Sequence, residues 1–169
     1  MFKINDYVVF GSTGVCQITD IIDESFGGPT EKKYYVLTPL HGNSSTIYVP
    51  VDNDKVVLRK ILKRSDIDEL ISIMPDLDNE WINEDSPRKA LFNEILQSGD
   101  LERVIHMIKI IYRRRQEVEE IGKKLSNADT ESLKAAEKLL HNEFALVLDI
   151  EPDEVGPFIR GEIQVKQKA

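Results

Sequence analysis

The chain of 169 residues has a single cysteine, Cys16, which excludes an internal disulfide bond and any CxxC metal site. It also lacks an apolar run near the ~18 residues that a membrane-spanning helix needs. Its start, MFKINDYVVF, places Asp6 before any apolar run of useful length, which is not the pattern of a secretory signal peptide. We therefore expect a protein of the reducing cytoplasm with no membrane partner.

Catalytic and cofactor motifs are also missing from the sequence. It contains no GxxxxGK[ST] loop, no GxGxxG fingerprint and no HxxxH pair. The three histidines, His41, His106 and His141, are far apart, whereas a zinc site needs three or four ligands close together. Acidic side chains are mostly solvated, so the carboxylate clusters do not by themselves indicate an acid–base pair. We predict that the protein is not an enzyme and uses no metal, cofactor or small-molecule substrate.

Charge is the next feature, with 22 basic and 30 acidic residues and a net charge of −8. An acidic chain is not expected to bind nucleic acid tightly by itself, because that affinity depends on neutralised phosphates. The charge is unevenly spread. Ser65 to Ser86 holds eight acidic residues and no basic one, whereas Arg88 to Lys124 holds nine basic and six acidic ones. A mildly basic region therefore sits inside an acidic chain.

Residues 1–60 have the pattern of short β-strands separated by turns that contain glycine. The spacing predicts strands at 7–10, 15–24, 33–37, 45–50 and 56–58. Such a series is typical of a small antiparallel barrel or a strongly bent sheet. The strand that ends at Pro50 carries no charge. It is either an edge strand whose backbone pairs with a partner or an interior strand of the barrel.

Residues 61–169 have the period of amphipathic helices. Caps and prolines predict helix boundaries at Ser65 with Asp68, at Pro75, at Ser86 with Pro87, at Ser98–Asp100, at 127–130 and at Pro152. We therefore predict an α+β protein, with a small β domain at 1–60 followed by a domain of about five helices at 61–169.

Basic residues at two places on these helices are candidates for contacts with phosphates. Arg88 and Lys89 open the second helix, where backbone N–H groups also attract anions. Lys109 and Arg113 are four residues apart and share a face of the third helix, on which Arg114 follows. The alternative is that these residues form ordinary surface ion pairs with neighbouring glutamates.

Trp81 is the only tryptophan, and it lies in the acidic string DLDNEWINED between two predicted helices. One interpretation is that its ring fastens this loop to the core. The other is that it projects as an apolar wedge, which nucleic-acid-binding proteins insert between bases.

In its order of motifs, the chain resembles the CarD/CdnL family of bacterial transcription regulators over roughly residues 1–150. The resemblance is carried by MFKINDYVVFGSTGVCQI, YYVLTP and IYVPV, and then by ILQSGDLERVIHMIKIIYRRRQE and LKAAEKLLHNEFALVL. It implies a Tudor-like first domain that binds the β subunit of RNA polymerase. It also implies a helical second domain that contacts promoter DNA at the upstream edge of the melted region, with a tryptophan as a wedge in the minor groove. The polymerase-binding strand of the family corresponds to Thr46 to Pro50.

Three positions depart from the pattern of the family. Its tryptophan usually stands about thirteen residues before the turn that matches Ser98, where this chain has Asp85, and Trp81 is four residues further upstream. The family often follows its tryptophan with a serine and two arginines, whereas this chain has Ser86-Pro87-Arg88. It also commonly has an arginine where this chain has Tyr48.

We predict a cytoplasmic, nucleoid-associated regulator that binds RNA polymerase and stabilises the promoter open complex. The residues expected to bind polymerase are Thr46, Tyr48, Val49 and Pro50. The residues expected to bind DNA are Trp81, Arg88, Lys89, Lys109, Arg113 and Arg114. Two alternatives remain at this point: a module that binds polymerase without touching DNA, and a small hydrolase that uses the acid pairs.

Overall fold

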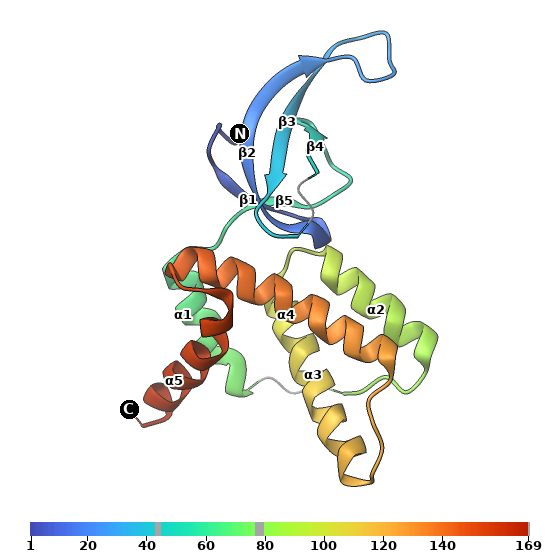
Figure 1. Ribbon diagram of the computed structural model, residues 1–169, viewed down its shortest axis with the longest axis vertical. Helices are drawn as coiled ribbons and strands as arrows, with labels where there is room; N and C mark the ends of the chain where they lie inside the picture. The colour runs from blue at the N-terminus through green and yellow to red at the C-terminus, as the bar shows by residue number, and fades with distance from the viewer. Residues whose placement is uncertain (43–44, 77–79, 169) are drawn as a thin grey trace. The chain divides into compact units, whose positions relative to one another are not determined.

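The computed structural model describes residues 1–42, 45–76 and 80–168. The chain divides into two compact units, Met1–Ile61 and Leu62–Ala169, which we call the strand unit and the helical unit (Figure 1). A five-stranded antiparallel sheet followed by five α-helices confirms the α+β class and the Tudor-like first domain. Within the described residues, no helix is both long enough and apolar enough to cross a membrane.

The strand unit consists of one antiparallel sheet with the order β4-β3-β2-β1-β5. The strands are β1 (Tyr7–Phe10), β2 (Gly14–Glu24), β3 (Lys32–Pro39), β4 (Ile47–Pro50) and β5 (Leu58–Lys60). A break in register between Ile18 and Asp20 of β2 marks a bulge, which bends the sheet and increases its local twist. The linear strand order places β4 and β5 at the two edges of the sheet.

One face of this sheet covers the core of the strand unit. Alternate residues point to opposite faces of a strand, so neighbouring strands contribute every second side chain to this core. Its buried members are Val8, Cys16, Ile18, Tyr35, Leu37 and Val49.

Two strands begin later than their sequence predicts. The strand expected at 45–50 starts at Ile47, and the strand expected at 56–58 is Leu58–Lys60. Leu58 is the first residue of that segment to align with β1, opposite Phe10. Val56 and Val57 are 43% and 38% exposed, and they lie in the connection that precedes β5 rather than in the strand itself.

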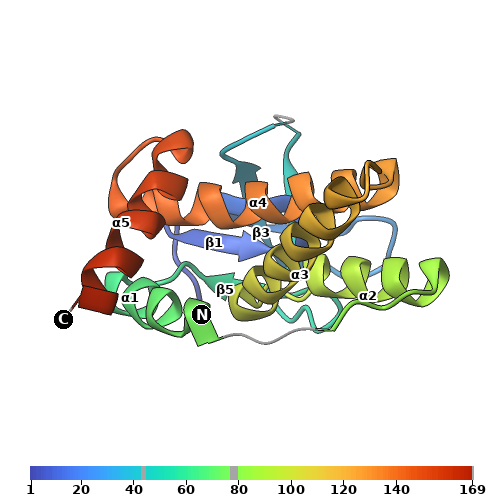
Figure 2. The same cartoon turned by 90° about the horizontal axis from the view of Figure 1, so that it is seen from below.

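The helical unit is built around α4 (Asn127–Leu148), which runs through its middle (Figures 1 and 2). At one end of α4 lie α1 (Arg64–Ile73) and α5 (Val155–Lys168), and toward the other lie α2 (Asp85–Gln97) and α3 (Leu101–Glu120). Apolar positions at helical spacing meet around this axis. The completely buried ones include Ile67, Ile71, Met107, Ile111, Ala136, Phe144 and Val155.

Helix ends show where local capping signals succeed and fail. Asp100 caps α3 as predicted, because its side chain accepts hydrogen bonds from the N–H groups of Glu102 and Arg103. The first two helices begin earlier than predicted, at Arg64 and at Asp85. At the start of α1, the Asp66 carboxylate accepts from the Lys63 N–H at 2.8 Å.

Two further predicted caps are also displaced. Ser86 and Pro87 lie inside the first turn of α2, a position that still tolerates proline because its N–H would have no helical partner. Helix α4 is capped by Ser126, one residue before the predicted range, because the Ser126 hydroxyl accepts from the Asp129 N–H.

Candidate functional site

The strand expected to bind polymerase, β4, has one hydrogen-bonded neighbour among the described strands, which is β3. The structure therefore favours an edge strand over an interior one. Along β4, Tyr48 is 48% exposed and Val49 only 3%. Thr46 lies exposed just before the strand. Val49 thus contributes its side chain to the core, while Tyr48 presents its ring to solvent.

The pairing of β4 with β3 determines which backbone groups stay available. The Val51 N–H donates to the Lys33 oxygen at 3.0 Å. Hydrogen-bonded pairs alternate along an antiparallel ladder, so Tyr48, which lies opposite Val36, is in a non-hydrogen-bonded pair. Its N–H and C=O therefore point to the open edge. Pro50 offers no N–H, and its oxygen already accepts from the Asn53 N–H at 2.9 Å.

Trp81 is half-buried and packs against the core of the helical unit. Its ring centre lies 6.2 Å from that of Phe92, in an edge-to-face arrangement. The guanidinium carbon of Arg88 is 4.5 Å from the indole centre, and that of Arg114 is 5.6 Å away. Both distances lie within the range of cation–π attraction. The ring is therefore held by α2 and α3 together, while part of it remains exposed.

Arg88 is 6% exposed and makes its contacts inside the helical unit. Its Nε donates to Asp129 Oδ1 at 3.0 Å, and its Nη2 donates to Asp129 Oδ2 at 3.1 Å and to Asp85 Oδ1 at 2.8 Å. Its Nη1 donates to the carbonyl oxygens of Ile82 at 2.9 Å and Asn83 at 3.3 Å. Burial opposes the charge, but the hydrogen bonds to the two aspartates outweigh it and raise the pKa of Arg88. Arg88 is therefore a support for the loop that carries Trp81.

Asp129, the main partner of Arg88, owes its position to the start of α4. It is 6% exposed and lies in the first turn, where its charge also interacts favourably with the helix dipole. Ser126 Oγ donates to Asp129 Oδ2 at 2.8 Å and accepts from the Asp129 N–H at 3.1 Å. The carboxylate is thus oriented before it meets Arg88, and the pair links α2 to α4.

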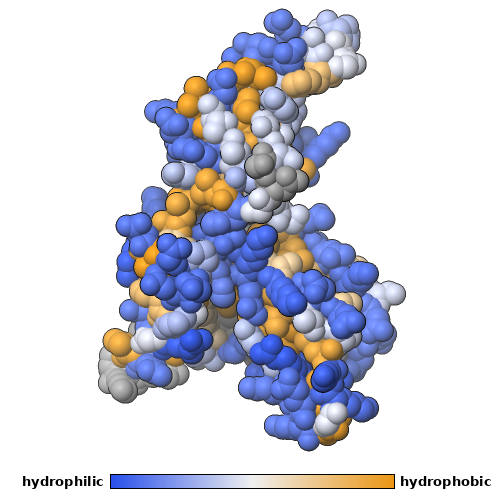
Figure 3. All heavy atoms as spheres, in the orientation of Figure 1, coloured by the Kyte–Doolittle hydropathy of each residue, from blue (hydrophilic) through white to orange (hydrophobic). Residues whose placement is uncertain are grey.

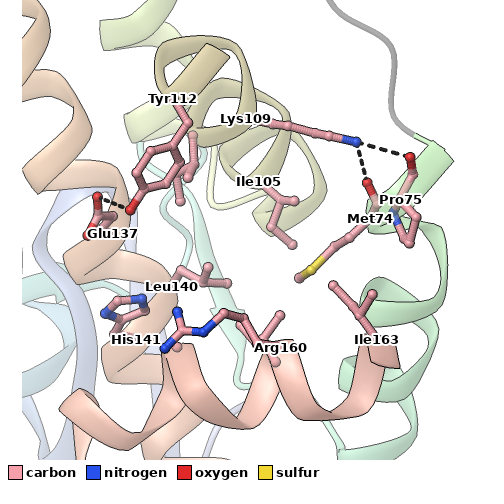
Figure 4. Close-up of a pocket in the computed structure, with 13 residues that line it drawn as sticks. Met74, Pro75, Ile105, Lys109, Tyr112, Glu137, Leu140, His141, Arg160 and Ile163 are labelled. Carbon is pink, nitrogen blue, oxygen red and sulfur yellow. Dashed lines mark hydrogen bonds between the residues drawn. The ribbon is translucent and has the colours of Figure 1, made fainter. Parts of the chain in front are cut away.

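The remaining basic candidates fall into two groups. The Lys109 ammonium donates to the carbonyl oxygens of Met74 at 2.7 Å and Pro75 at 3.2 Å (Figure 4). It thus provides a hydrogen-bond donor for two carbonyl groups that directly follow α1. Lys89 and Arg113 are exposed. Lys89 makes no ion pair with any residue of the described ranges. Arg114 therefore lies beside Trp81, whereas Lys89 and Arg113 are exposed on the surface. The Lys109 ammonium lies instead at the carbonyl groups that follow α1.

A groove of about 500 Å³ lies beside Lys109, between α3, α4 and α5 (Figure 4). Its wall is mainly apolar, with Ile105, Leu140 and Ile163 pointing into it. The Tyr112 hydroxyl donates to the Glu137 carboxylate at 2.9 Å. His141 is desolvated there, which lowers its pKa despite the nearby carboxylate. Within the described residues, no group of histidine, cysteine and acidic side chains is arranged to hold a metal ion.

Sequence reasoning missed four residues, two in the helical unit and two in the strand unit. The pairing of Asp129 with Arg88 was not predicted, because an acidic residue in the first turn of a helix normally serves only as a cap. Phe26 was assigned to a loop and Tyr34 to a strand, and the contacts of the Phe26 ring with Tyr34 and Tyr48 depend on how β3 pairs with β4. Glu143, which is 1% exposed and accepts from the Leu62 N–H at 2.8 Å, has the pattern of a solvated helix residue.

Comparison with known families gives two matches that together cover most of the chain. The model described as "CarD-like/TRCF RID domain" matches residues 2–62. The model described as "CarD, C-terminal domain" matches residues 69–160. The first match covers the strand unit with its edge strand β4, and the second covers α2 to α4 with Trp81, Arg88 and Asp129.

Proposed function

Because the chain belongs to the CarD family of RNA polymerase-interacting transcription factors, we propose that it stabilises the promoter open complex by binding polymerase and upstream DNA at once. The strand unit binds the polymerase β subunit, and the helical unit contacts the DNA. The protein acts through binding alone, as a non-enzymatic factor of the cytoplasm.

The polymerase contact is supported by the open edge of β4. Tyr48 directs its N–H and C=O away from β3, so an extended segment of the β subunit has both a donor and an acceptor to pair with. The Pro50 oxygen already accepts from the Asn53 N–H, and Pro50 has no N–H, so Tyr48 is the last residue of β4 that offers both groups for pairing. The contact is therefore centred on Thr46 to Tyr48, and Pro50 limits its length.

The observation that carries the DNA contact is the setting of Trp81. Its indole is half-buried and in contact with the guanidinium groups of Arg88 and Arg114, so little conformational entropy is lost when it meets a base step. Lys89 and Arg113 are exposed on the same two helices and supply charge for phosphates. Arg88 acts indirectly, by keeping Trp81 in place.

Anchoring on polymerase explains how an acidic protein with few exposed bases acts on DNA. Tethering raises the local concentration of DNA at the helical unit, so weak contacts suffice. A differential stabilisation of about 1–2 kcal/mol shifts the open-complex equilibrium roughly five- to thirtyfold.

The test is the lifetime of open complexes formed by cognate polymerase, with and without the protein. The wild type is compared with Trp81→Ala and with Trp81→Phe, which keeps an aromatic ring in the same packing. We expect the wild type to lengthen the lifetime, Trp81→Ala to lose most of the effect, and Trp81→Phe to retain part of it. Equal lifetimes for all three proteins, each longer than without protein, would remove Trp81 from the DNA contact.

A second function, polymerase binding without DNA contact, is favoured by the acidic neighbours of Trp81. Glu80, Glu84 and Asp85 are exposed and repel phosphates. Under this alternative the protein binds polymerase but leaves the open-complex lifetime unchanged at every salt concentration.

A further inference from the structure

We propose, on the basis of the polymerase contact proposed above, that the segment paired with β4 carries an apolar side chain that packs on an aromatic patch beside this edge. The patch consists of Phe26, Tyr34 and Tyr48. It determines which segment the edge accepts, because backbone pairing alone does not distinguish between sequences.

The Phe26 ring contacts both of the other rings of the aromatic patch. The centre of the Phe26 ring lies 5.0 Å from that of Tyr34 and 5.1 Å from that of Tyr48. These are ordinary distances for packed aromatic pairs. Phe26 is 52% exposed and Tyr48 is 48% exposed, although each already contacts another ring. Two large apolar side chains therefore gather on the surface, beside backbone groups of β4 that no described strand pairs with.

The sheet register places the aromatic patch on the face opposite the core. Tyr48 lies directly across from Val36, and Tyr34 lies across from Pro50, so these four side chains share one face. Their sequence neighbours Tyr35 and Val49 point to the other face, and each is 3% exposed. The patch and the core thus use alternate residues of the same two strands.

Phe26 reaches the patch from the connection between β2 and β3. Gly27 follows it with φ +67°, a conformation that side-chain-bearing residues rarely adopt. The connection therefore reverses immediately after Phe26, and the ring lies against β3 and β4 rather than extending along β2. Apolar surface is visible on the strand unit among hydrophilic side chains (Figure 3).

A strand added to β4 places one of its residues directly opposite Tyr48. That side chain lies on the face of the patch and meets the Tyr48 ring, with Phe26 beside it. An apolar side chain gains from burying these rings, roughly in proportion to the area removed from water. A carboxylate loses its hydration there and meets the electron-rich faces of the rings. The favoured occupant is therefore an extended segment with an aliphatic or aromatic residue at this position.

The experiment measures equilibrium binding of the full chain to core RNA polymerase at two salt concentrations. The variants are Phe26→Ala, Phe26→Leu and the control Ile4→Ala, which removes a side chain that is 49% exposed from the segment before β1. We expect Phe26→Ala to raise the Kd about tenfold. Phe26→Leu has a smaller effect, Ile4→Ala has none, and the loss for Phe26→Ala is the same at both salt concentrations. Unfolding curves verify that each variant is folded.

The outcomes separate this proposal from the function on which it rests. If the wild type does not bind polymerase, the polymerase contact itself fails. If the wild type binds and the folded Phe26→Ala variant binds equally well, the aromatic patch has no role and the polymerase contact stands. If the loss on Phe26→Ala shrinks strongly as salt rises, the group that packs on the patch is charged and the apolar assignment is overturned.

Discussion

The guanidinium of Arg88 lies 4.5 Å from the centre of the Trp81 ring, and it also donates hydrogen bonds to the Asp129 carboxylate at 3.0 Å and 3.1 Å. A residue expected at the DNA is thus an internal link between α4 and the loop that carries the tryptophan. The acidic residue that holds it is 41 positions away in sequence. The position of Trp81 depends on this pair.

We expect Asp129→Ala to lower the free energy of unfolding by about 3–5 kcal/mol, because it leaves the buried Arg88 with an incomplete set of partners. The measurement is urea unfolding followed by Trp81 fluorescence, which reports on the same region. Glu94→Ala, which breaks the exposed ion pair with Arg103, is the control and changes stability far less. Equal losses for the two variants would show that the buried pair has no special weight.

We expect Arg113→Glu to shorten the open-complex lifetime gained with the protein, and to do so more at about 50 mM than at about 200 mM salt. The reason is that a phosphate contact is lost and a repulsion is added. The control is Arg103→Glu, which changes the net charge equally on the same helix and breaks the ion pair of Arg103 with Glu94 at 3.0 Å. If both variants shorten the lifetime equally, the effect comes from net charge and not from a contact by Arg113.

Stability should fall in mild acid through His141. Desolvation lowers the pKa of His141 in the folded state below its ordinary value of 6.5, although the carboxylate of Glu137 opposes this shift. The unfolded state therefore binds the proton more readily, so the contribution is complete above pH 6.5 and is lost as the pH falls through the folded-state pKa. Denaturant unfolding between pH 7.5 and pH 5 measures the slope.

His141→Gln should flatten this slope, whereas substitution of the exposed His41 should leave it unchanged. A slope that persists in His141→Gln would assign the pH dependence to another group.

Cys16 should be inert toward thiol reagents while the protein is folded. It is 0% exposed, and burial raises its pKa to about 11. At pH 8 only about one thiol in a thousand is therefore ionised, and the thiolate is the reactive form. Labelling with an aromatic disulfide reagent should be slow in buffer and complete in denaturing urea. Fast stoichiometric labelling of the folded chain would contradict the buried position.

Local sequence patterns determined most of the secondary structure of this chain. Apolar residues with a high β-propensity identified the segment of β1, and the stripe of α3 from Leu101 to Ile111 followed the helical period. β-Branched and aromatic side chains fit the pleated backbone of a strand, and the spacing of the buried face of a helix is set by backbone geometry alone. Asp100 capped its helix as predicted for the same reason, since its partners are the next N–H groups along the chain.

Tertiary structure decided which charged and aromatic residues face a partner. An arginine in a first helical turn has the same local sequence pattern whether it binds a phosphate or a buried carboxylate. Arg88 pairs with Asp129 only because α4 packs against α2. Glu143 is buried in the helical unit, where its carboxylate accepts a hydrogen bond from the Leu62 N–H, 81 positions away. The contact of Phe26 with Tyr48 required the register of β3 and β4. Such pairs join residues that are far apart in sequence. They form when whole helices and strands pack together, so the local periodicity of the sequence does not predict them.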